Sequence, residues 1–584
     1  MSRGARFGLV AVAVALQAGL AVHAMRGNSA TFDEGTHLPA GYTHLALGDH
    51  RLNPEQPPLV KLLAAGPLLA LAPELREADV SWTEARQWEF GRRFLYRWND
   101  ADRLLLLGRL PVVALASCLV VAVFLTARQR FSVPAAAAAA FLCVLSPDVL
   151  AHGALVTTDL GFALFFFLAV IAFERLLEHA SWARLLAAGL ATGAAFATKF
   201  TAPILVPVFV ILGLRAAFWD ATVSSALTGT RRSVVGRLAH LLVLLSGVAV
   251  LALAVVWASY GFRGPLSPDP DVRAELGRPL EARPSEPVRA GVAFAGRAGI
   301  VPEDYARGLL FVAEHSAARP TFLLGERRNH GFPHYFAVSF LLKTPVPLLL
   351  LIALALGRIR RLRTRDAAFV WIPVAAYLAA TATRGLQIGH RHLLPIYPFL
   401  FLAAGEAAAA LLEWRPPRGK AVTAALALWY AGGTLLQHPH HLAYFNELGG
   451  GSRNGWRLLV DSNLDWGQDL KRLAEWLRAN PAPGLKLSYF GSADPAYYGI
   501  ESEALPGYRA PHAPRITREI RPGDVVIVSA TNLQGVYLEA EDRALMQRLR
   551  ALEPVARIGY SIFVYRPDFT WPPLPLPAPP PTDR

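Results

Sequence analysis

Two adjacent carboxylates, Asp33 and Glu34, stand in the stretch "TFDEGTHLPAGY", directly after the first long apolar run of the chain. A carboxylate at the boundary between lipid and water can act as a general base. The stretch also fits a capping box, in which Thr31 accepts a hydrogen bond from the Glu34 amide and Glu34 reaches back to Thr31. The two interpretations are compatible, because Glu34 can cap a helix while Asp33 on the same turn faces a cavity. Asp33 is therefore the stronger catalytic candidate, with Glu34 beside it.

A second acidic position, Asp159, follows Thr157 and Thr158 at the start of another apolar run. An ionisable group at the start of a membrane segment is costly, so a functional placement or a cationic partner is the default expectation. The alternative is a helix cap by one of the two threonines, with Asp159 favoured by the helix dipole. We predict that Asp159 is the second carboxylate of a catalytic site.

Basic side chains occur at comparable boundaries. Lys199 stands in "ATKFTAP", Arg391 stands between His390 and His392 in "GHRHLLPIYP", and Arg327 stands in "GERRNHGF". Cations of this kind can hold a phosphate group at headgroup depth by charge-assisted hydrogen bonds. The alternative for each cation is a snorkelling side chain or a contact with a lipid headgroup. We predict that Lys199 and Arg391 clamp a phosphate and that the other three side chains support them.

The elements that must position these residues are membrane-spanning helices. Apolar residues make up 53% of the 584 positions and charged residues only 17%, which is too apolar for a soluble protein of this length. A spanning helix needs about 20 mostly apolar residues. We predict an α-helical membrane protein with about eleven spans. The predicted spans lie near 7–25, 104–126, 133–150, 155–177, 184–199, 201–217, 238–260, 336–357, 367–383, 392–412 and 420–436.

The distribution of basic residues predicts the orientation of these spans. Clusters such as "MSRGAR", "ARQRF", "RIRRLRTR" and "EWRPPRGK" all fall on one side when the spans are counted. Because arginine and lysine concentrate in cytoplasmic loops, the N-terminus is predicted to be cytoplasmic. The same clusters account for the net charge of +14 without nucleic-acid binding. The first run could instead be a cleaved signal peptide, which would leave the remaining topology unchanged.

On this topology, the polar residues collect outside the cytoplasm, in a first outer loop (26–103) and a middle outer loop (263–335). Within the first outer loop, residues 57–72 and 81–98 predict helices that lie in the membrane interface. Residues 1–436 thus form one transmembrane domain. The expected location is the bacterial plasma membrane, crossed several times.

The residues after the last span change character. The stretches "LKLSYFG", "DVVIVSAT" and "IGYSIFVYR" predict strands, and residues 466–478 and 540–552 predict helices. We therefore expect a small extracytoplasmic α/β domain over 437–570. The remaining residues, 571–584, form a Pro-rich and extended tail.

Several histidine-rich and acidic stretches could in principle bind a metal ion. The histidines of "QHPHHLAYFNE" and "THLPAGYTHLALGDH" do not have the spacing of a structural zinc site. A catalytic site can draw ligands from distant segments, so a divalent metal remains possible. The stretch "DSNLDWGQDL" fails the EF-hand pattern, with Arg472 in place of the bidentate glutamate, and fits a helix cap better. The usual signatures of dinucleotide binding, of P-loops and of serine hydrolases do not occur.

The chain resembles the GT-C class of glycosyltransferases, specifically family 39, which includes protein O-mannosyltransferases and the bacterial aminoarabinose transferase of lipid A. The resemblance is carried by "FDEGTHLPAGY", "NPEQPPLVKLLAA", "TTD" at Asp159, "ATKFTAP" and "GHRHLLPIYPFL", and it spans residues 5–415. It implies an inverting transfer of a sugar from a polyprenyl-phosphate carrier to an acceptor on the outer face. The family's base maps onto Asp33 and its second acid onto Asp159.

The acceptor implied by the resemblance is an envelope lipid, glycan or protein. The chain lacks the inserted sugar-binding modules of the eukaryotic mannosyltransferases, so protein mannosylation does not follow. The main rival hypothesis is a transporter or flippase for a polyprenyl-linked or anionic lipid. Such proteins place their polar site near the bilayer midplane between repeated halves, whereas here the polar residues lie at the outer edge. The enzyme is therefore the favoured function.

Overall fold

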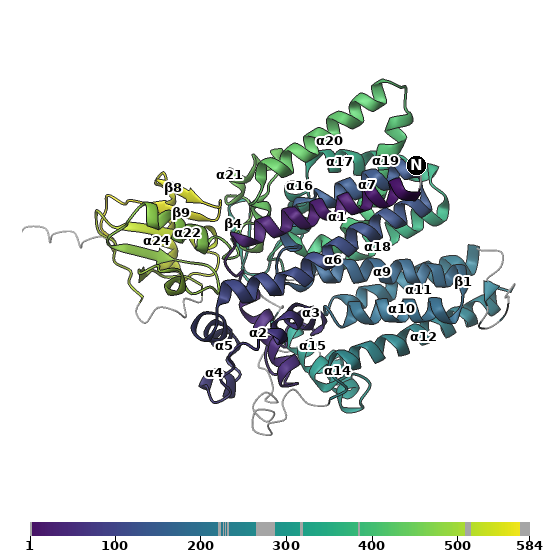
Figure 1. The fold of residues 1–584 in the computed structure, drawn as a ribbon, viewed down its shortest axis with the longest axis horizontal. Coiled ribbons are helices and arrows are strands. Elements are labelled where there is room, and N and C mark those ends of the chain that lie inside the picture. The colour runs from purple at the N-terminus through teal and green to yellow at the C-terminus, as the bar shows by residue number, and fades with distance from the viewer. Residues whose placement is uncertain are drawn as a thin grey trace, which may run out of the picture.

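The computed structural model describes residues 3–219, 224–225, 227, 229, 233–263, 286–315, 319–382, 386–508 and 516–572. Residues 264–285 and 316–318 of the predicted middle loop, and all but the first two residues of the predicted tail 571–584, lie outside the described residues. Within the described part, a large helical bundle carries a small sheet domain at one end (Figure 1).

The bundle consists of apolar helices whose inward faces form one continuous core. The helices that pack together most closely are α10 with α9 and with α12, and α7 with α19. The helices are α1 (Arg3–Arg26), α6 (Ala101–Arg130), α7 (Val133–Val144), α8 (Pro147–His152), α9 (Thr158–Glu178), α10 (Trp182–Phe196), α11 (Leu205–Trp219), α12 (Val234–Ser259), α16 (Tyr335–Lys343), α17 (Val346–Gly357), α18 (Thr364–Ala382), α19 (Tyr397–Glu413) and α20 (Arg418–Gln437).

The predicted membrane fold is confirmed. Every predicted span falls on one of these helices or helix pairs. Within the described residues, six helices are long and apolar enough to cross a membrane, and seven if the bent pair α16 and α17 counts as one span. The remaining helices α7, α10, α18 and α20 are too short or less apolar, so the count of eleven stays a prediction.

Short helices lie between α1 and α6, where the sequence predicted interfacial helices. The region 57–72 contains α3 (Leu59–Ala65) and a 3-10 turn, and the region 81–98 contains α5 (Gln87–Arg93) and a π-helical turn. Their aromatic rings form a second core under α2. The elements are α2 (Glu34–Ala46), α3, η1 (Gly66–Ala70), α4 (Val80–Thr83), α5 and η2 (Phe94–Trp98).

Further short elements connect the bundle. Of the described residues between α12 and β3, two stretches form helices, and β1 pairs with β2 and β3 with β4. They are α14 (Glu286–Arg297), α15 (Glu303–His315), β1 (His179–Ala180), β2 (Ser224–Ser225), β3 (Thr321–Leu323), β4 (Glu326–Arg328), η3 (Ala202–Ile204), η4 (Ile359–Arg361), η5 (His390–Ile396), η6 (His441–Ala443), η7 (Glu447–Gly449) and α21 (Ser452–Gly455).

The C-terminal domain is a five-stranded sheet of order β6-β5-β7-β9-β8. Strand β5 runs parallel to β6 and β7, whereas β9 runs antiparallel to β7, with Ile527 opposite Val564. Its central strands β7 and β9 are mostly apolar and buried throughout, as expected of strands that are covered on both faces. The elements are η8 (Asp461–Asn463), α22 (Leu470–Ala479), β5 (Leu485–Ser488), η9 (Pro495–Tyr498), β6 (Glu503–Ala504), β7 (Val525–Ser529), α23 (Ala530–Leu533), α24 (Ala540–Arg550), β8 (Ala556–Ile558) and β9 (Ile562–Tyr565).

One helix boundary predicted from sequence is wrong. The helix expected over 466–478 begins at Leu470, because the carbonyl oxygens of Trp466 and Gln468 accept from the amides of Phe32 and Ser29 rather than from helical N–H groups. We call residues 461–469 the inserted segment. Figure 1 shows that the sheet domain lies at the end of the bundle that also carries α2 and α5. Its Ser492 hydroxyl donates to the Thr31 carbonyl oxygen at 3.0 Å.

Candidate functional site

Arg391 joins the two predicted catalytic carboxylates. Its Nη1 donates to Asp33 Oδ2 at 2.8 Å and to Asp159 Oδ2 at 3.1 Å. Lys199 Nζ donates to the other oxygen of Asp159. The four residues come from four separate places in the sequence, and the structure brings them into one cluster, which we call the charged cluster. It contains two acids and two cations, so its charges balance.

Helix termini position the acids of the charged cluster. Asp33 immediately precedes α2, and Asp159 lies in the first turn of α9. Helix N-termini present unpaired backbone N–H groups and favour negative charge. Arg391 lies in η5, just ahead of α19, and Lys199 lies in the turn after α10. The polar residues thus occupy the ends of apolar helices, as the sequence predicted.

The two carboxylates differ in exposure. The Asp33 side chain is 25% exposed, whereas that of Asp159 is 1% exposed. A substrate hydroxyl can therefore reach Asp33, while Asp159 is enclosed by its two cations. This arrangement suits Asp33 as a base and Asp159 as the group that holds Lys199 and Arg391 in place.

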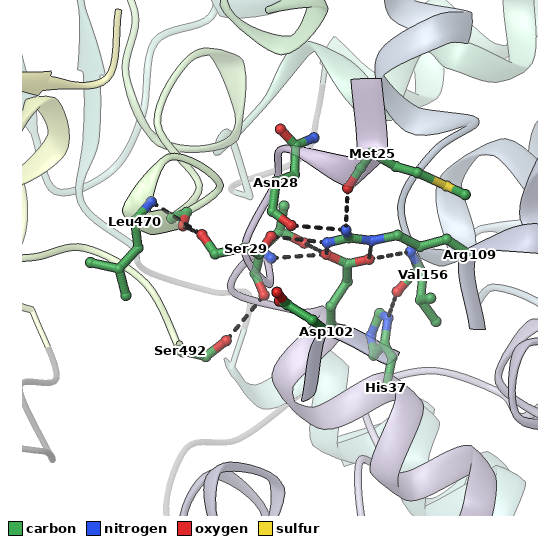
Figure 2. A network of polar contacts seen from close by, with 12 residues as sticks. Met25, Asn28, Ser29, His37, Asp102, Arg109, Val156, Leu470 and Ser492 are labelled. Carbon is green, nitrogen blue, oxygen red and sulfur yellow. Dashed lines mark hydrogen bonds and ion pairs between the residues drawn. The ribbon is translucent and has the colours of Figure 1, made fainter. Parts of the chain in front are cut away.

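Glu34 occupies a different place from its neighbour. Its carboxylate forms a two-fold ion pair with Arg109, at 2.8 and 2.7 Å, and both side chains are buried. The remaining N–H groups of Arg109 donate to the carbonyl oxygens of Met25, Asn28 and Ser29 (Figure 2). This pair closes the loop between α1 and α2 against α6.

The environment of Glu34 fixes its charge. Burial raises the pKa of this carboxyl, but the Arg109 guanidinium and the N–H groups of Thr31 and Val156 outweigh burial and lower the pKa overall. Every oxygen of Glu34 is already engaged in these bonds. Glu34 is therefore a positioning residue in this geometry, and the catalytic role predicted for it is not supported.

The predicted capping box is only half formed. Thr31 donates from both its N–H and its hydroxyl to Glu34 Oε2, at 2.9 and 3.0 Å. Helix α2 begins at Glu34, so the N-cap residue is Asp33, whose side chain makes no capping bond. The Asp33 carboxylate is instead turned to Arg391. This outcome separates the two acids as the sequence suggested, with Asp33 in the site.

The predicted supporting cations take other roles. The His390 ring contacts the Tyr397 hydroxyl at 2.6 Å and points into the bundle. The His392 ring packs edge-on near Phe336, with centroids 6.3 Å apart. Arg327 lies on β4, where its Nε donates to the Val536 carbonyl oxygen at 2.7 Å. Within the described part of the chain, neither His390 nor Arg327 forms a hydrogen bond or ion pair with Asp33 or Asp159.

Sequence reasoning missed the inserted segment. Ser462 Oγ accepts from Arg391 Nε at 3.1 Å, and the Asn463 side chain accepts from the His390 amide at 2.8 Å. The guanidinium of Arg391 lies over the Trp466 ring, 4.1 Å from its centroid. The C-terminal domain therefore supplies side chains that hold Arg391. The signal was "DSNLDW", a polar run that was interpreted as a helix cap.

Lys61 was also missed. It lies on α3, is buried, and its Nζ donates to the carbonyl oxygens of Asn53 and Gln56, both at 2.8 Å. Burial lowers the pKa of Lys61 to about 7. The Gln56 side chain also accepts from the Thr158 hydroxyl at 3.4 Å. Gln56 therefore links Lys61 to the first turn of α9. The sequence signal was a lone lysine in the apolar stretch "PPLVKLLAA".

The sequence left open whether the chain binds a divalent metal ion. Over the described ranges, no three His, Cys, Asp or Glu side chains are placed to hold a metal ion. Two of the histidines in "QHPHHLAYFNE" contact each other, and one of them also contacts His23 of α1. His438 lies 2.6 Å from His23 and 3.0 Å from His441, nitrogen to nitrogen. The metal requirement predicted as possible stays untested.

A family model matches the middle of the bundle. Residues 105–257 match the family described as dolichyl-phosphate-mannose-protein mannosyltransferase. The matched segment includes Arg109, Asp159 and Lys199. The match confirms the resemblance to family 39 inferred from the sequence motifs. The predicted enzyme class, a glycosyltransferase with a lipid-linked sugar donor, is confirmed at this level. No curated protein sequence matches the chain.

Two solved structures align with this chain at low sequence identity. ArnT from Cupriavidus metallidurans, bound to undecaprenyl phosphate, aligns over 97% of this chain and 98% of its own, at 15% identity and a TM-score of 0.47. The archaeal oligosaccharyltransferase AglB from Archaeoglobus fulgidus, in complex with an inhibitory peptide and a dolichol-phosphate, aligns over 81% of this chain and 58% of its own, at 13% identity and a TM-score of 0.44.

Proposed function

We propose that this chain transfers a sugar from a polyprenyl-phosphate carrier to an envelope acceptor on the outer face of the membrane, with inversion at the anomeric carbon. The observation that carries the proposal is the contact of Arg391 with both Asp33 and Asp159. It combines a partly exposed base with cations that can hold a phosphate. The family match over residues 105–257 supports the same chemistry.

The proposed reaction is a single displacement. The acceptor hydroxyl oxygen attacks the anomeric carbon, and the bond from that carbon to the phosphate oxygen breaks. Asp33 takes the hydroxyl proton, and the polyprenyl phosphate leaves with the bonding electron pair. One displacement inverts the configuration. The enzyme supplies position, a base and charge stabilisation rather than a covalent intermediate.

The cations act on the leaving group. The phosphate gains negative charge as the sugar departs, and Lys199 and Arg391 can stabilise that charge by hydrogen bonds that are stronger in a water-poor site. Asp159 keeps both cations in position before the donor binds. A phosphate that takes over Arg391 Nη1 also releases Asp33 from its ion pair. Donor binding would thereby free the base for the acceptor.

The outer-face assignment is supported by the distribution of basic residues. Arg358 and Arg361 lie beyond α17 and Arg418 begins α20, whereas the charged cluster lies at the opposite ends of the helices. Because arginine-rich loops remain cytoplasmic, the site faces the other compartment. A cysteine-accessibility test with a membrane-impermeant reagent, on single cysteines placed at Lys420 and Glu84, measures this orientation directly.

The test of the proposed function uses the purified full chain in proteoliposomes, with polyprenyl-phosphate sugars that differ in the sugar and with an envelope extract as the source of acceptor. Release of free polyprenyl phosphate by the wild-type chain, lost in Asp33→Asn, is the expected result. Movement of intact donor between the leaflets without cleavage would identify a flippase instead. Lipid mass spectrometry of cells that lack the gene then identifies the sugar, since the unused donor accumulates.

A further inference from the structure

Five aromatic rings converge beside the charged cluster, and we call them the aromatic face: Phe32, Trp88, Phe490, Tyr508 and Tyr537. Phe32 contacts Trp88 at 4.8 Å and Phe490 at 5.4 Å between ring centroids. Tyr508 and Tyr537 lie 4.4 Å apart, and Tyr537 stacks on Phe490 at 6.0 Å. Two rings come from the first outer loop and three from the C-terminal domain. The face therefore exists only where these two parts meet.

The rings of the aromatic face form two layers. Phe32 and Phe490 are buried, at 7% and 2% exposure, whereas Trp88, Tyr508 and Tyr537 are only partly buried and pack against them. The inner layer fixes the outer rings. The outer rings keep part of their surface open to solvent. An interface that served only to dock the C-terminal domain would gain most by burying all of its rings.

Polar groups border the outer rings. The Tyr537 hydroxyl donates to Asp461 Oδ2 at 2.5 Å, and Arg319 Nη2 donates to the Tyr508 hydroxyl at 3.2 Å. The Arg319 guanidinium also lies 5.9 Å from the Tyr537 ring centroid. Asp461 has a backbone φ of +58°, a conformation that few non-glycine residues adopt. A carboxylate, a guanidinium and two phenols thus surround an apolar surface.

The aromatic face adjoins the charged cluster through Phe32 and through Asp461, the partner of Tyr537. Phe32 immediately precedes Asp33, the proposed base. Asp461 immediately precedes Ser462, whose hydroxyl accepts from Arg391. A molecule lying on the aromatic face would therefore extend from the inserted segment to the carboxylate that takes the acceptor proton.

We propose that the aromatic face is the acceptor subsite and that it binds the sugar ring of a carbohydrate acceptor. The C–H groups of a sugar ring carry slight positive charge and pack against the negative face of an aromatic ring. Its hydroxyl groups require donors and acceptors at the border, which Asp461, Arg319 and the tyrosine hydroxyls provide. An acyl chain would form no hydrogen bonds with this polar border, whereas the hydroxyl groups of a sugar can. The inference rests on the proposed function and specifies its acceptor class.

The test is saturation-transfer difference NMR on the full chain in nanodiscs, with a panel of methyl pyranosides as probes. Trp88→Leu and Tyr508→Leu each remove one outer ring. Trp98→Leu is the matched control, since Trp98 lies on the same outer loop but packs on Phe90. We expect the wild type and the control to saturate the ring protons of at least one pyranoside. Each outer-ring variant should bind that probe about tenfold more weakly.

Folding and the polar border are checked in parallel. Unfolding midpoints identify any variant that has lost its structure, and Tyr537→Phe keeps the ring while removing its bond to Asp461. We expect Tyr537→Phe to fold and to bind the pyranoside more weakly than the wild type. Unchanged pyranoside binding in Trp88→Leu, Tyr508→Leu and Tyr537→Phe would overturn the inference. So would the absence of any bound pyranoside in the wild type.

Two further outcomes separate this inference from the proposed function. Donor cleavage by a wild-type chain that binds no pyranoside would count against the acceptor subsite alone. Pyranoside binding by a chain that never cleaves a polyprenyl-phosphate sugar would count against the proposed function alone. A short peptide or a soluble phospholipid that displaces the pyranoside and loses affinity in the same variants would identify another acceptor class and overturn the carbohydrate assignment.

Discussion

Arg391 Nη1 and Asp33 Oδ2 lie 2.8 Å apart although their residues are separated by 358 positions in the chain. The same nitrogen contacts Asp159, so one guanidinium links the start of α2 to the start of α9. Because Asp33 shares this cation with a second acid, an incoming phosphate competes directly with it. Donor use should therefore depend on this competition and on the groups that hold Arg391.

Asp33→Asn should abolish sugar transfer while leaving the fold intact. Asparagine keeps the size of the side chain but cannot take a proton, and general-base catalysis contributes about 10²- to 10⁴-fold. The measurement is the rate of polyprenyl-phosphate release by the purified variant. Glu74→Gln is the control, since Glu74 forms an exposed pair with Arg76 at the surface. Full turnover by Asp33→Asn would remove this residue from the mechanism.

Lys199→Ala and Arg391→Ala should raise the donor concentration needed for half-maximal rate. Each variant removes one positive charge that faces the phosphate, and hydrogen bonds to charged groups contribute about 1.5–3 kcal/mol. Arg391→Lys should recover only part of the loss, because an ammonium cannot contact Asp33, Asp159 and a phosphate in fork geometry. Lys420→Ala, at an exposed lysine of α20, is the control. Unchanged donor dependence in both alanine variants would mean that the two cations do not bind the donor phosphate.

The charged cluster was predictable from sequence because each member interrupts or begins an apolar run. A charged side chain is costly at such a position, so its presence indicates that it pairs with an opposite charge elsewhere in the chain. This applies to Asp33, Asp159, Lys199 and Arg391. The apolar periodicity likewise predicted the helices and the strands of the C-terminal domain. A charged residue beside an apolar run can be recognised from its immediate neighbours, so a single sequence is enough to predict such a site.

The inserted segment was not predictable in the same way. Ser462 and Trp466 carry no charge, and their importance arises from a contact with Arg391 across the chain. A polar run ahead of an amphipathic helix indicates a cap equally well. The pairing of Glu34 with Arg109 was hidden for a related reason, since a capping box also accounts for a glutamate at that spacing.

Glu34→Gln and Arg109→Ala should each strongly destabilise the folded protein. Removing one partner of a buried ion pair leaves the other charge uncompensated, which costs about 3–5 kcal/mol. The measurement is the thermal unfolding midpoint of each variant in detergent, with Glu74→Gln as the exposed control. A double variant that is no less stable than the worse single variant would show the expected coupling. Additive effects would mean that the two residues act independently.

The contribution of Glu34 to the stability of the folded protein should also depend on pH. Its pKa is lowered in the folded state from an ordinary value of 4.5, so its stabilisation is fully present above pH 4.5. The stabilisation is lost as the pH falls through the lowered pKa. The unfolding midpoint of the wild type should therefore fall more steeply than that of Glu34→Gln below pH 4.5. Parallel curves would contradict the pairing.

Lys61 should also make stability rise with pH, but in a higher pH range. Burial lowers its pKa to about 7 from an ordinary value of 10.5, so the folded state releases a proton that the unfolded chain retains between these values. The cost of burying this lysine is fully present below pH 7 and disappears as the pH approaches 10.5. The difference in unfolding midpoint between Lys61→Met and the wild type should therefore shift in favour of the wild type as the pH rises from 7 to 10. A difference that does not change with pH would show that Lys61 titrates normally.

Trp466→Leu should weaken donor use although Trp466 lies in the C-terminal part of the chain. Its ring lies under the Arg391 guanidinium at 4.1 Å, and a desolvated cation–π contact contributes about 2 kcal/mol. Loss of the ring should let Arg391 move away from its two acids and raise the half-maximal donor concentration. Trp466→Phe should recover most of the activity, since a smaller ring still presents a π face. Trp476→Leu, on the partly exposed side of α22, is the control. If Trp466→Leu lowered only the unfolding midpoint and left the donor dependence unchanged, its role would be packing rather than positioning of Arg391.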